Sequence, residues 1–261
     1  MSTLAHTVSD SRTMLRRNLK HAVRYPIITY LIATPVIFLL LFVYVFGATL
    51  GTGIGGTGTD AYLNYVVPGV LLLAITGGVT GPALSVSKDL TEGIIARFRT
   101  MNISRSAVLT GHVIGNLIQV LIAVTVVLAI ALLMGFRAPA DVLGWLGAAG
   151  LLVAIGYALC WLGAAFGVFA KGVESASNLP MPLMLLPFLG SGFVPTDSMP
   201  AGLRWFAEHQ PFTPINETLR GLLIGTHIGS DGIVALAWCA VITVGSYVWS
   251  LRLYARGPRS L

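Results

Sequence analysis

Six stretches of this sequence are apolar and contain no Asp, Glu, Lys or Arg. A bilayer has a hydrocarbon core about 30 Å thick, which a helix of about 20 residues crosses. The fifth stretch is the shortest and contains three prolines, which a membrane helix tolerates when neighbouring protein satisfies the freed backbone groups. We therefore predict an all-α polytopic membrane protein with six transmembrane helices. The predicted spans are Ile27–Gly47, Tyr62–Val86, Ala107–Met134, Leu143–Ala170, Leu179–Val194 and Ile233–Leu251.

The composition excludes a soluble enzyme. Only 10% of the residues are charged and 55% are hydrophobic, whereas soluble domains carry about 25% charged residues. The formal charge of +6 could indicate a nucleic-acid partner, but the positions of the charges argue against one. Cys160 and Cys239 lie inside apolar runs without ligand neighbours, so they predict neither a disulfide nor a metal site.

The basic residues lie mostly on one side of the predicted membrane. If all six stretches cross, the two termini and the loops 87–106 and 171–178 share a side that carries 13 of the 16 Lys and Arg residues. The net charge is then +9 on that side and −3 on the other, so the positive-inside rule makes the first side cytoplasmic. Without the fifth span the basic C-terminus would lie outside. The sequence thus predicts a multi-pass protein of the plasma (inner) membrane with both termini in the cytoplasm.

The first 26 residues are polar and basic, and no clear small-residue cleavage site follows the first apolar stretch. We therefore expect that stretch to be an uncleaved anchor. Leu15, Leu19 and Val23 recur at helical spacing, with basic residues on the other faces. This pattern predicts an amphipathic helix on the cytoplasmic leaflet, in contact with lipid headgroups; a plain topology signal is the alternative. The predicted organisation is a cytoplasmic N-terminal segment, a membrane domain and a cytoplasmic tail, covering residues 1–26, 27–253 and 254–261.

Neither glycine-rich motifs nor nucleotide motifs indicate a cofactor. Gly51, Gly53 and Gly56 match G-x-G-x-x-G, but a dinucleotide site also requires a preceding strand. The stretch Gly51–Asp60 is instead expected to be a flexible connector on the outer side. The sequence has no G-x-x-x-x-G-K-[ST] run, so we expect no cofactor and no ATP bound by this chain alone.

Three polar residues of the third span lie on one helical stripe. His112, Asn116 and Gln119 are spaced at i, i+4 and i+7, which is typical either of a polar substrate path or of hydrogen bonds between helices. His112 is the one obviously ionisable side chain within the spans. Ion-coupled transporters usually place such groups near the midplane, whereas His112 is close to the cytoplasmic end of its span. Any energy for transport is therefore expected to enter from outside the bilayer.

Two loops have helical patterns of their own. In the cytoplasmic loop, Leu90, Ile94 and Phe98 recur every four residues, which predicts a short amphipathic helix over 88–101 that enters the leaflet or a groove on a partner. The proline-rich outer segment 195–231 predicts two short helices, near Pro200–Ala207 and Pro214–Ile224, half-inserted at the outer end. Glu217 and Arg220 lie at i,i+3 on the second of these helices, and they can form a solvated surface pair or a functional one.

A family resemblance rests on these two loops. Two parts of the chain resemble ABC transporter type-2 permeases of the daunorubicin-resistance-like branch. The first is the run Lys88–Leu117, with Glu92-Gly93, Arg97-Phe98-Arg99 and Gly111. The second consists of the blocks Ser191–Pro200, Trp205–Pro211 and Glu217–Leu223. The resemblance covers essentially the whole chain. Where family members often have a proline after the loop helix, this chain has Asn102-Ile103.

The resemblance implies both partners and residue roles. It implies a coupling helix that inserts into a separate ABC ATPase present in two copies, a second permease copy forming a homodimer or heterodimer, and ATP and Mg²⁺ bound by the ATPase. The outer short helices are implied to be re-entrant. The coupling residues carried over are Glu92, Gly93, Arg97, Phe98 and Arg99.

The sequence therefore predicts the permease subunit of an ATP-driven exporter of an amphipathic drug, antibiotic or lipid-like substrate. We expect this subunit to catalyse no chemical reaction itself. A passive structural or assembly membrane protein is the alternative. An intramembrane serine protease is disfavoured: Gly190-Ser191-Gly192 resembles its serine motif, but His112 lies near the opposite face and His209 and His227 lie in the outer loop.

Overall fold

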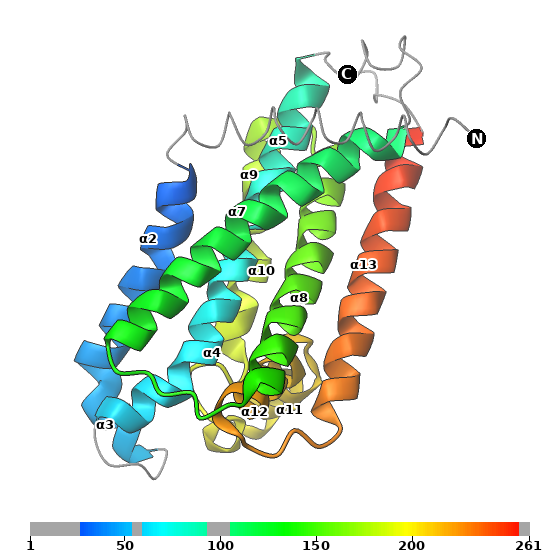
Figure 1. The fold of residues 1–261 in the computed structure, drawn as a ribbon. Helices are drawn as coiled ribbons and strands as arrows, with labels where there is room; N and C mark the ends of the chain where they lie inside the picture. Colours follow the sequence, from blue (N-terminus) through cyan, green and yellow to red (C-terminus); the bar gives the residue numbers. More distant parts are fainter. Residues whose placement is uncertain (1–26, 54–58, 93–104, 256–261) are drawn as a thin grey trace.

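The computed structural model describes residues 27–53, 59–92 and 105–255. Over these ranges every regular element is helical (Figure 1). Five helical runs among the described residues are long and apolar enough to cross a membrane. The predicted N-terminal interfacial helix and the C-terminal tail from residue 256 lie outside these ranges.

The first span is a continuous helical run in three parts. It consists of α2 (Ile27–Leu40), a π-helical turn η1 (Leu41–Phe46) and α3 (Gly47–Gly53). The run includes Gly51 and Gly53, so the prediction of a flexible connector from Gly51 was wrong for these residues. Local helical hydrogen bonding continues there, because glycine lowers helix propensity by only about 1 kcal/mol. Residues 54–58 of the predicted connector lie outside the described ranges.

The second span is divided into two helices. Helix α4 (Thr59–Gly77) and helix α5 (Thr80–Thr91) are joined by a turn in which Gly78 N donates to Ile75 O at 3.0 Å. Pro82 lies in the first turn of α5, where a proline costs no helical hydrogen bond. The helix extends five residues past the predicted end at Val86. Lys88–Thr91, predicted to begin a separate loop helix, is instead the last turn of α5, and residues 93–104 lie outside the described ranges.

Three further helices correspond to the third, fourth and sixth predicted spans. They are α7 (Arg105–Leu133), α8 (Val142–Phe169) and α13 (Asp231–Ala255). Helix α8 has a clear start, because Asp141 Oδ1 accepts a hydrogen bond of 2.8 Å from Gly144 N. Long apolar runs thus located these helices to within a few residues.

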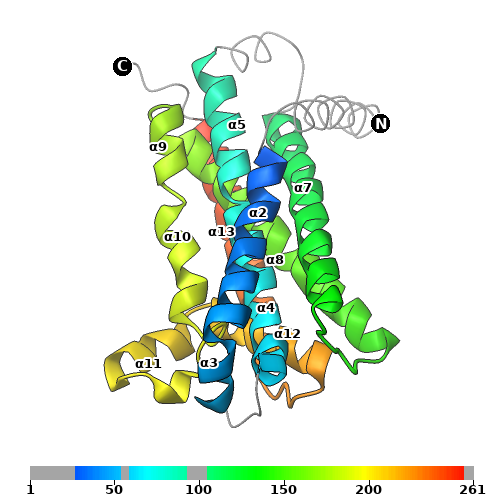
Figure 2. The same ribbon diagram turned by 90° about the vertical axis from the view of Figure 1, so that its left-hand side faces the viewer.

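The fifth predicted span is a series of short helices. Helix α9 (Val173–Asn178) occupies the predicted loop 171–178. Helix α10 (Met181–Leu185) and the 3₁₀ turn η2 (Leu186–Leu189) follow it within the predicted span, along the side of the bundle (Figure 2). Pro180 and Pro187 stand at the junctions, where a missing N–H group interrupts helical hydrogen bonding. This segment is therefore absent from the five continuous candidate spans.

The two short helices predicted in the outer segment are present. Helix α11 (Ala201–His209) and helix α12 (Phe212–Ile224) lie at the end of the bundle opposite to the end of α5, with the 3₁₀ turn η3 (Thr196–Ser198) before them (Figures 1 and 2). We call these two ends the α12 end and the α5 end. Helix α12 buries most of its residues against α4, α8 and α13, whereas α11 buries only Ala207.

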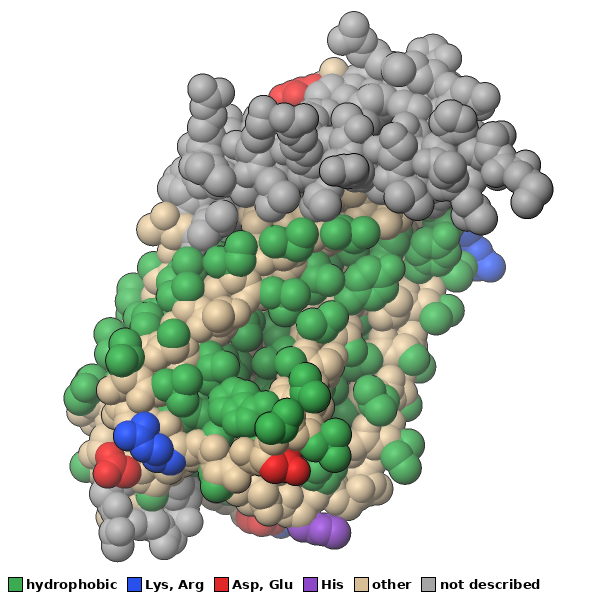
Figure 3. All heavy atoms as spheres, viewed as in Figure 1, with side chains coloured by type: hydrophobic (Ala, Val, Ile, Leu, Met, Phe, Trp, Pro, Cys, Tyr) green, Lys and Arg blue, Asp and Glu red, His purple; other side chains and the backbone are tan. Residues whose placement is uncertain are grey.

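Small residues bring α8 against α5. A Cβ atom on Gly163 would lie 2.3 Å from Val79 O, and one on Gly167 would lie 2.6 Å from Ala83 O. Outside these contacts, apolar side chains cover the flank of the bundle (Figure 3). Ile233 on α13, for example, is 77% exposed. Such a surface is stable in contact with lipid or another membrane helix, where burial of these side chains is favourable.

Candidate functional site

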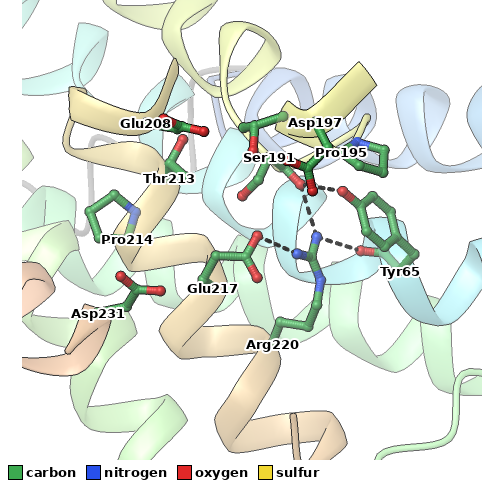
Figure 4. Close-up of a pocket in the computed structure, with 11 residues that line it drawn as sticks. Tyr65, Ser191, Pro195, Asp197, Glu208, Thr213, Pro214, Glu217, Arg220 and Asp231 are labelled. Carbon is green, nitrogen blue, oxygen red and sulfur yellow. Dashed lines mark hydrogen bonds and ion pairs between the residues drawn. The ribbon is translucent and has the colours of Figure 1, made fainter. Parts of the chain in front are cut away.

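A cavity of about 460 Å³ opens among the polar residues of the α12 end. The side chains around it come from α4, α11, α12, the start of α13, η3 and the irregular segment before η3 (Figure 4). Its lining residues are Tyr65, Ser191, Pro195, Thr196, Asp197, Glu208, Thr213, Pro214, Glu217, Arg220 and Asp231.

Arg220 is the central side chain of this cavity. It forms an ion pair with Glu217, the i,i+3 partner considered from the sequence. Its side chain is only 8% exposed, so the pair differs from a solvated surface pair. The guanidinium also donates from Nη2 to Ser191 O at 2.9 Å and to Tyr65 O at 3.3 Å, and its carbon lies 3.9 Å from the centre of the Tyr65 ring. Arg220 thus connects α12 to α4 and to the irregular segment.

The irregular segment 190–194 is held by side chains from neighbouring helices. Tyr65 donates from its hydroxyl to Ser191 O at 2.9 Å, and Tyr62 donates to Phe193 O at 3.1 Å. Gln210 donates to Leu186 O at 3.1 Å, just before the segment. Non-helical backbone at membrane depth is stable only where protein or water satisfies its polar groups. These tyrosines and Arg220 satisfy the carbonyl groups that a helix would have satisfied internally.

Close backbone contact fixes the segment against α4. A Cβ atom on Gly69 would lie 2.4 Å from the carbonyl oxygen of Gly192. Only glycine permits this approach, because any side chain would displace backbone rather than a flexible side chain. Asn216 on α12 adds a hydrogen bond of 3.3 Å to Ser191 Oγ. The α12 end is therefore a packed assembly of α4, α12 and the segment between η2 and η3.

The rim of the cavity is acidic. Four carboxylates line it, against the single guanidinium of Arg220. Asp197 and Glu208 are both bound by Arg204 of α11, at 2.6 and 2.7 Å. These bonds raise the pKa of Arg204 above its ordinary value, chiefly through the hydrogen bond to Glu208. Asp231 adds its negative charge at the start of α13, so the cavity favours cations over anions.

The polar stripe of the third span lies away from this cavity. His112, Asn116 and Gln119 are buried on α7. Asn116 Nδ2 donates to His112 O at 3.2 Å, and Gln119 Nε2 donates to Gly115 O at 3.3 Å. His112 Nε2 lies 3.0 Å from Asp89 Oδ2 of α5. The two amide side chains therefore bond within α7, whereas the His112 ring contacts α5.

Most of the predicted coupling residues lie outside the described ranges. Gly93, Arg97, Phe98 and Arg99 belong to the stretch 93–104. Glu92 directly follows α5 and forms an exposed ion pair with Lys88 at 3.7 Å. Glu92 thus marks the point at which the chain leaves the bundle at the α5 end.

Three residues of the cavity and of the α5–α7 contact were missed from the sequence. Tyr62 and Tyr65 look like ordinary aromatic residues of an apolar span, and Asp89 was assigned to a loop. A signal for Asp89 was present, because it follows the apolar span Tyr62–Val86 within one helical turn. The tyrosines had no comparable signal, since their partners lie more than 120 residues away in the sequence.

The structure provides no support for a serine protease at Ser191. The side chain bonded to Ser191 Oγ is the amide of Asn216, which is not a base. His209 bonds Trp205 O at 2.8 Å and stacks on the Trp205 ring, and His112 lies at the α5 end beside Asp89. Among the described residues, none of these histidines contacts the serine.

Comparison with known proteins identifies the class of membrane protein. The family model described as ABC-2 type transporter matches residues 10–224. The daunorubicin resistance ABC transporter permease protein DrrB1 of Streptomyces coeruleorubidus is 31% identical over 254 residues, which cover 96% of this chain and 87% of that protein. The residues compared thus include both ends of the bundle.

Two further relatives are more distant. The probable doxorubicin resistance ABC transporter permease protein DrrC of Mycobacterium tuberculosis is 25% identical over 78% of this chain and 74% of its own. The inner membrane transport permease YadH of Escherichia coli is 26% identical over 87% of this chain and 88% of its own. All three relatives are named as permeases.

Proposed function

This chain belongs to the ABC-2 type transporter family, and we propose that it is the membrane subunit of an exporter that moves an amphipathic drug, antibiotic or lipid-like molecule out of the cell. The names of two relatives, which refer to daunorubicin and doxorubicin resistance, support a drug as substrate. The chain itself is a permease and not the enzyme that hydrolyses ATP.

The proposed topology has six spans in the plasma membrane. Support for the fifth span comes from the course of α9, α10 and η2 from the α5 end to the α12 end (Figure 2). With this crossing, α11 and α12 lie on the outer side as re-entrant helices, and both termini lie in the cytoplasm. The charge distribution of the sequence supports the same orientation.

The observation that carries the proposal is the acidic cavity at the α12 end. It is built on non-helical backbone held by Arg220, Tyr65 and Tyr62. Such backbone is stable at membrane depth only when it is buried in protein or lines a water-filled path. In the proposed orientation the cavity is the outer mouth of the path, and its negative charge attracts cations.

The energy for export comes from a partner in this proposal. We propose that two copies of an ABC ATPase bind ATP and Mg²⁺ and press on the cytoplasmic stretch 88–101, with Glu92, Gly93, Arg97, Phe98 and Arg99 at the contact. A second permease copy completes the path at the interface between the two subunits. The absence of a P-loop motif from the sequence supports the need for a separate ATPase.

The proposal is tested with inside-out membrane vesicles and doxorubicin as the probe. Tagged permease is first purified from its native membrane to identify a co-purifying ATPase. Vesicles that contain the complex should then accumulate doxorubicin when ATP and Mg²⁺ are added, because their cytoplasmic face is outward. A complex with a hydrolysis-deficient ATPase is the matched control and should accumulate none.

Two results would contradict the proposal. Accumulation driven by a proton or sodium gradient without ATP would show that the energy enters elsewhere. Failure of any ATPase to co-purify, together with no ATP-dependent accumulation of doxorubicin or fluorescent lipid, would favour a passive structural role.

A further inference from the structure

Asp89 and His112 make a buried polar contact across two helices. Asp89 Oδ2 and His112 Nε2 are 3.0 Å apart, and each side chain is 9% exposed. Asp89 belongs to the last turn of α5, and His112 lies two turns into α7. Ionisable groups inside a membrane bundle are expensive to bury and are retained mainly where they have a defined role. A buried pair is most useful for fixing the register of the elements it joins.

The pair stands at the base of the cytoplasmic loop. The chain leaves α5 after Thr91 and returns at Arg105, the first residue of α7. Asp89 and His112 therefore join the two helices on either side of residues 93–104. A force on that loop acts on α5 and α7 together when the pair is intact. The pair adds a direct polar link between the two helices next to this loop.

Two further contacts continue from the pair along the same seam. A Cβ atom on Gly81 of α5 would lie 2.0 Å from Asn116 Oδ1 of α7, and one on Gly78 would lie 2.2 Å from a methyl carbon of Val120. Positions 89, 81 and 78 thus meet positions 112, 116 and 120 in antiparallel order. The glycines allow a close approach along the seam, and the polar pair fixes its cytoplasmic end.

Helix α5 is also separated from the outer part of its own span. The turn at Gly78 divides it from α4, which is held by Arg220 and the segment 190–194. Towards the α5 end, α8 packs on α5 through Gly163 and Gly167. At the α5 end, α5, α7 and α8 therefore pack against one another in one buried apolar cluster, which includes Val86, Leu109 and Trp161.

From this arrangement we propose that Asp89 and His112 are positioning residues that transmit motion of the loop 93–104 to α5 and α7 as one unit. The inference rests on the proposed function, because the motion is supplied by the ATPase. It assigns to this pair a role in coupling, without contact with substrate or nucleotide. Loss of the pair should leave ATP hydrolysis intact and reduce the transport obtained from it.

The test uses the full chain with Asp89→Asn, His112→Gln and the exchange Asp89→His with His112→Asp. Ser85→Ala is the control, because Ser85 bonds carbonyl groups of its own helix. Spin labels at Thr91 and Thr110 report the α5–α7 distance in liposomes. The two single variants should broaden this distance distribution, whereas the control and the exchange should resemble the parent.

The second measurement is doxorubicin accumulated per ATP hydrolysed by the assembled complex. The single variants should lower this ratio about tenfold, a typical size for energetic coupling between sites, with ATPase association unchanged. The exchange should restore most of the ratio. Single variants with a parental ratio and a parental distance distribution would overturn the inference, as would an exchange that restores neither.

A covalent bridge keeps the inference falsifiable if the single variants fold poorly. Cysteines placed at positions 89 and 112 are joined with a short bifunctional thiol reagent. Continued transport after bridging supports motion as one unit, whereas arrest would show that α5 and α7 must separate. If the parental complex itself moves no doxorubicin with ATP, the proposed function fails, and the distance distributions alone then decide whether the pair fixes α5 to α7.

Discussion

Arg220 donates a hydrogen bond of 2.9 Å from Nη2 to the carbonyl oxygen of Ser191, although the two residues belong to different segments of the bundle. The contact stabilises backbone that is not helical, and the hydroxyl of Tyr65 on α4 donates a second hydrogen bond to the same oxygen. A single side chain of α12 therefore helps to determine the shape of the cavity at the α12 end.

Replacement of Arg220 should strongly destabilise the protein. In Arg220→Met, Glu217 loses its partner and Ser191 O loses a donor. A hydrogen bond to a charged group typically contributes about 1.5–3 kcal/mol. The thermal unfolding temperature of the purified protein should therefore fall clearly. Arg204→Met, which removes the exposed ion pairs with Asp197 and Glu208, is the control and should change it little; equal shifts would contradict the buried role of Arg220.

The hydroxyl of Tyr62 should contribute to stability. Tyr62→Phe leaves Phe193 O without its donor, and an unsatisfied buried carbonyl costs about 1–3 kcal/mol. Thermal unfolding of Tyr62→Phe should show this loss. Tyr44 is 72% exposed, so Tyr44→Phe serves as the matched comparison. If both variants unfold at the parental temperature, the bond to Phe193 does not hold the segment.

Two glycines of α8 should respond differently to alanine. Gly163→Ala places a methyl group 2.3 Å from Val79 O, whereas Gly150 has no atom within 4 Å of the added carbon. Overpacking typically costs about 1–3 kcal/mol, so Gly163→Ala should lower thermal stability. Gly150→Ala should be neutral or slightly stabilising, because alanine favours the helix. The opposite order would show that α8 and α5 are not in close contact.

Cysteine labelling should locate the two ends of the fifth segment on opposite sides of the membrane. Lys171 and Ser198 are exposed, before α9 and within η3 respectively. In intact cells, an impermeant maleimide should label Ser198→Cys, and Lys171→Cys should react only after permeabilisation. The native cysteines are buried and should give little background. Equal labelling of both positions in intact cells would contradict a crossing by α9, α10 and η2.

Much of the architecture was predictable because the membrane imposes local rules. A helix that crosses lipid must be long, apolar and nearly free of charge, so α7, α8 and α13 could be located without knowledge of their neighbours. The helices α11 and α12 were predictable for a related reason, since prolines mark their starts. The break within the second span was not, because Gly77 and Gly78 are only two of 30 glycines in the chain.

By itself, the sequence determined the helical class and the approximate positions of the long apolar helices, since both depend on how short stretches of chain interact with lipid and water. Only the tertiary structure showed that Asp89 meets His112 and that Tyr62, Tyr65 and Arg220 hold the segment 190–194. These contacts join residues 23 to 155 positions apart. They depend on how the helices pack around one another, which no local pattern of residues specifies.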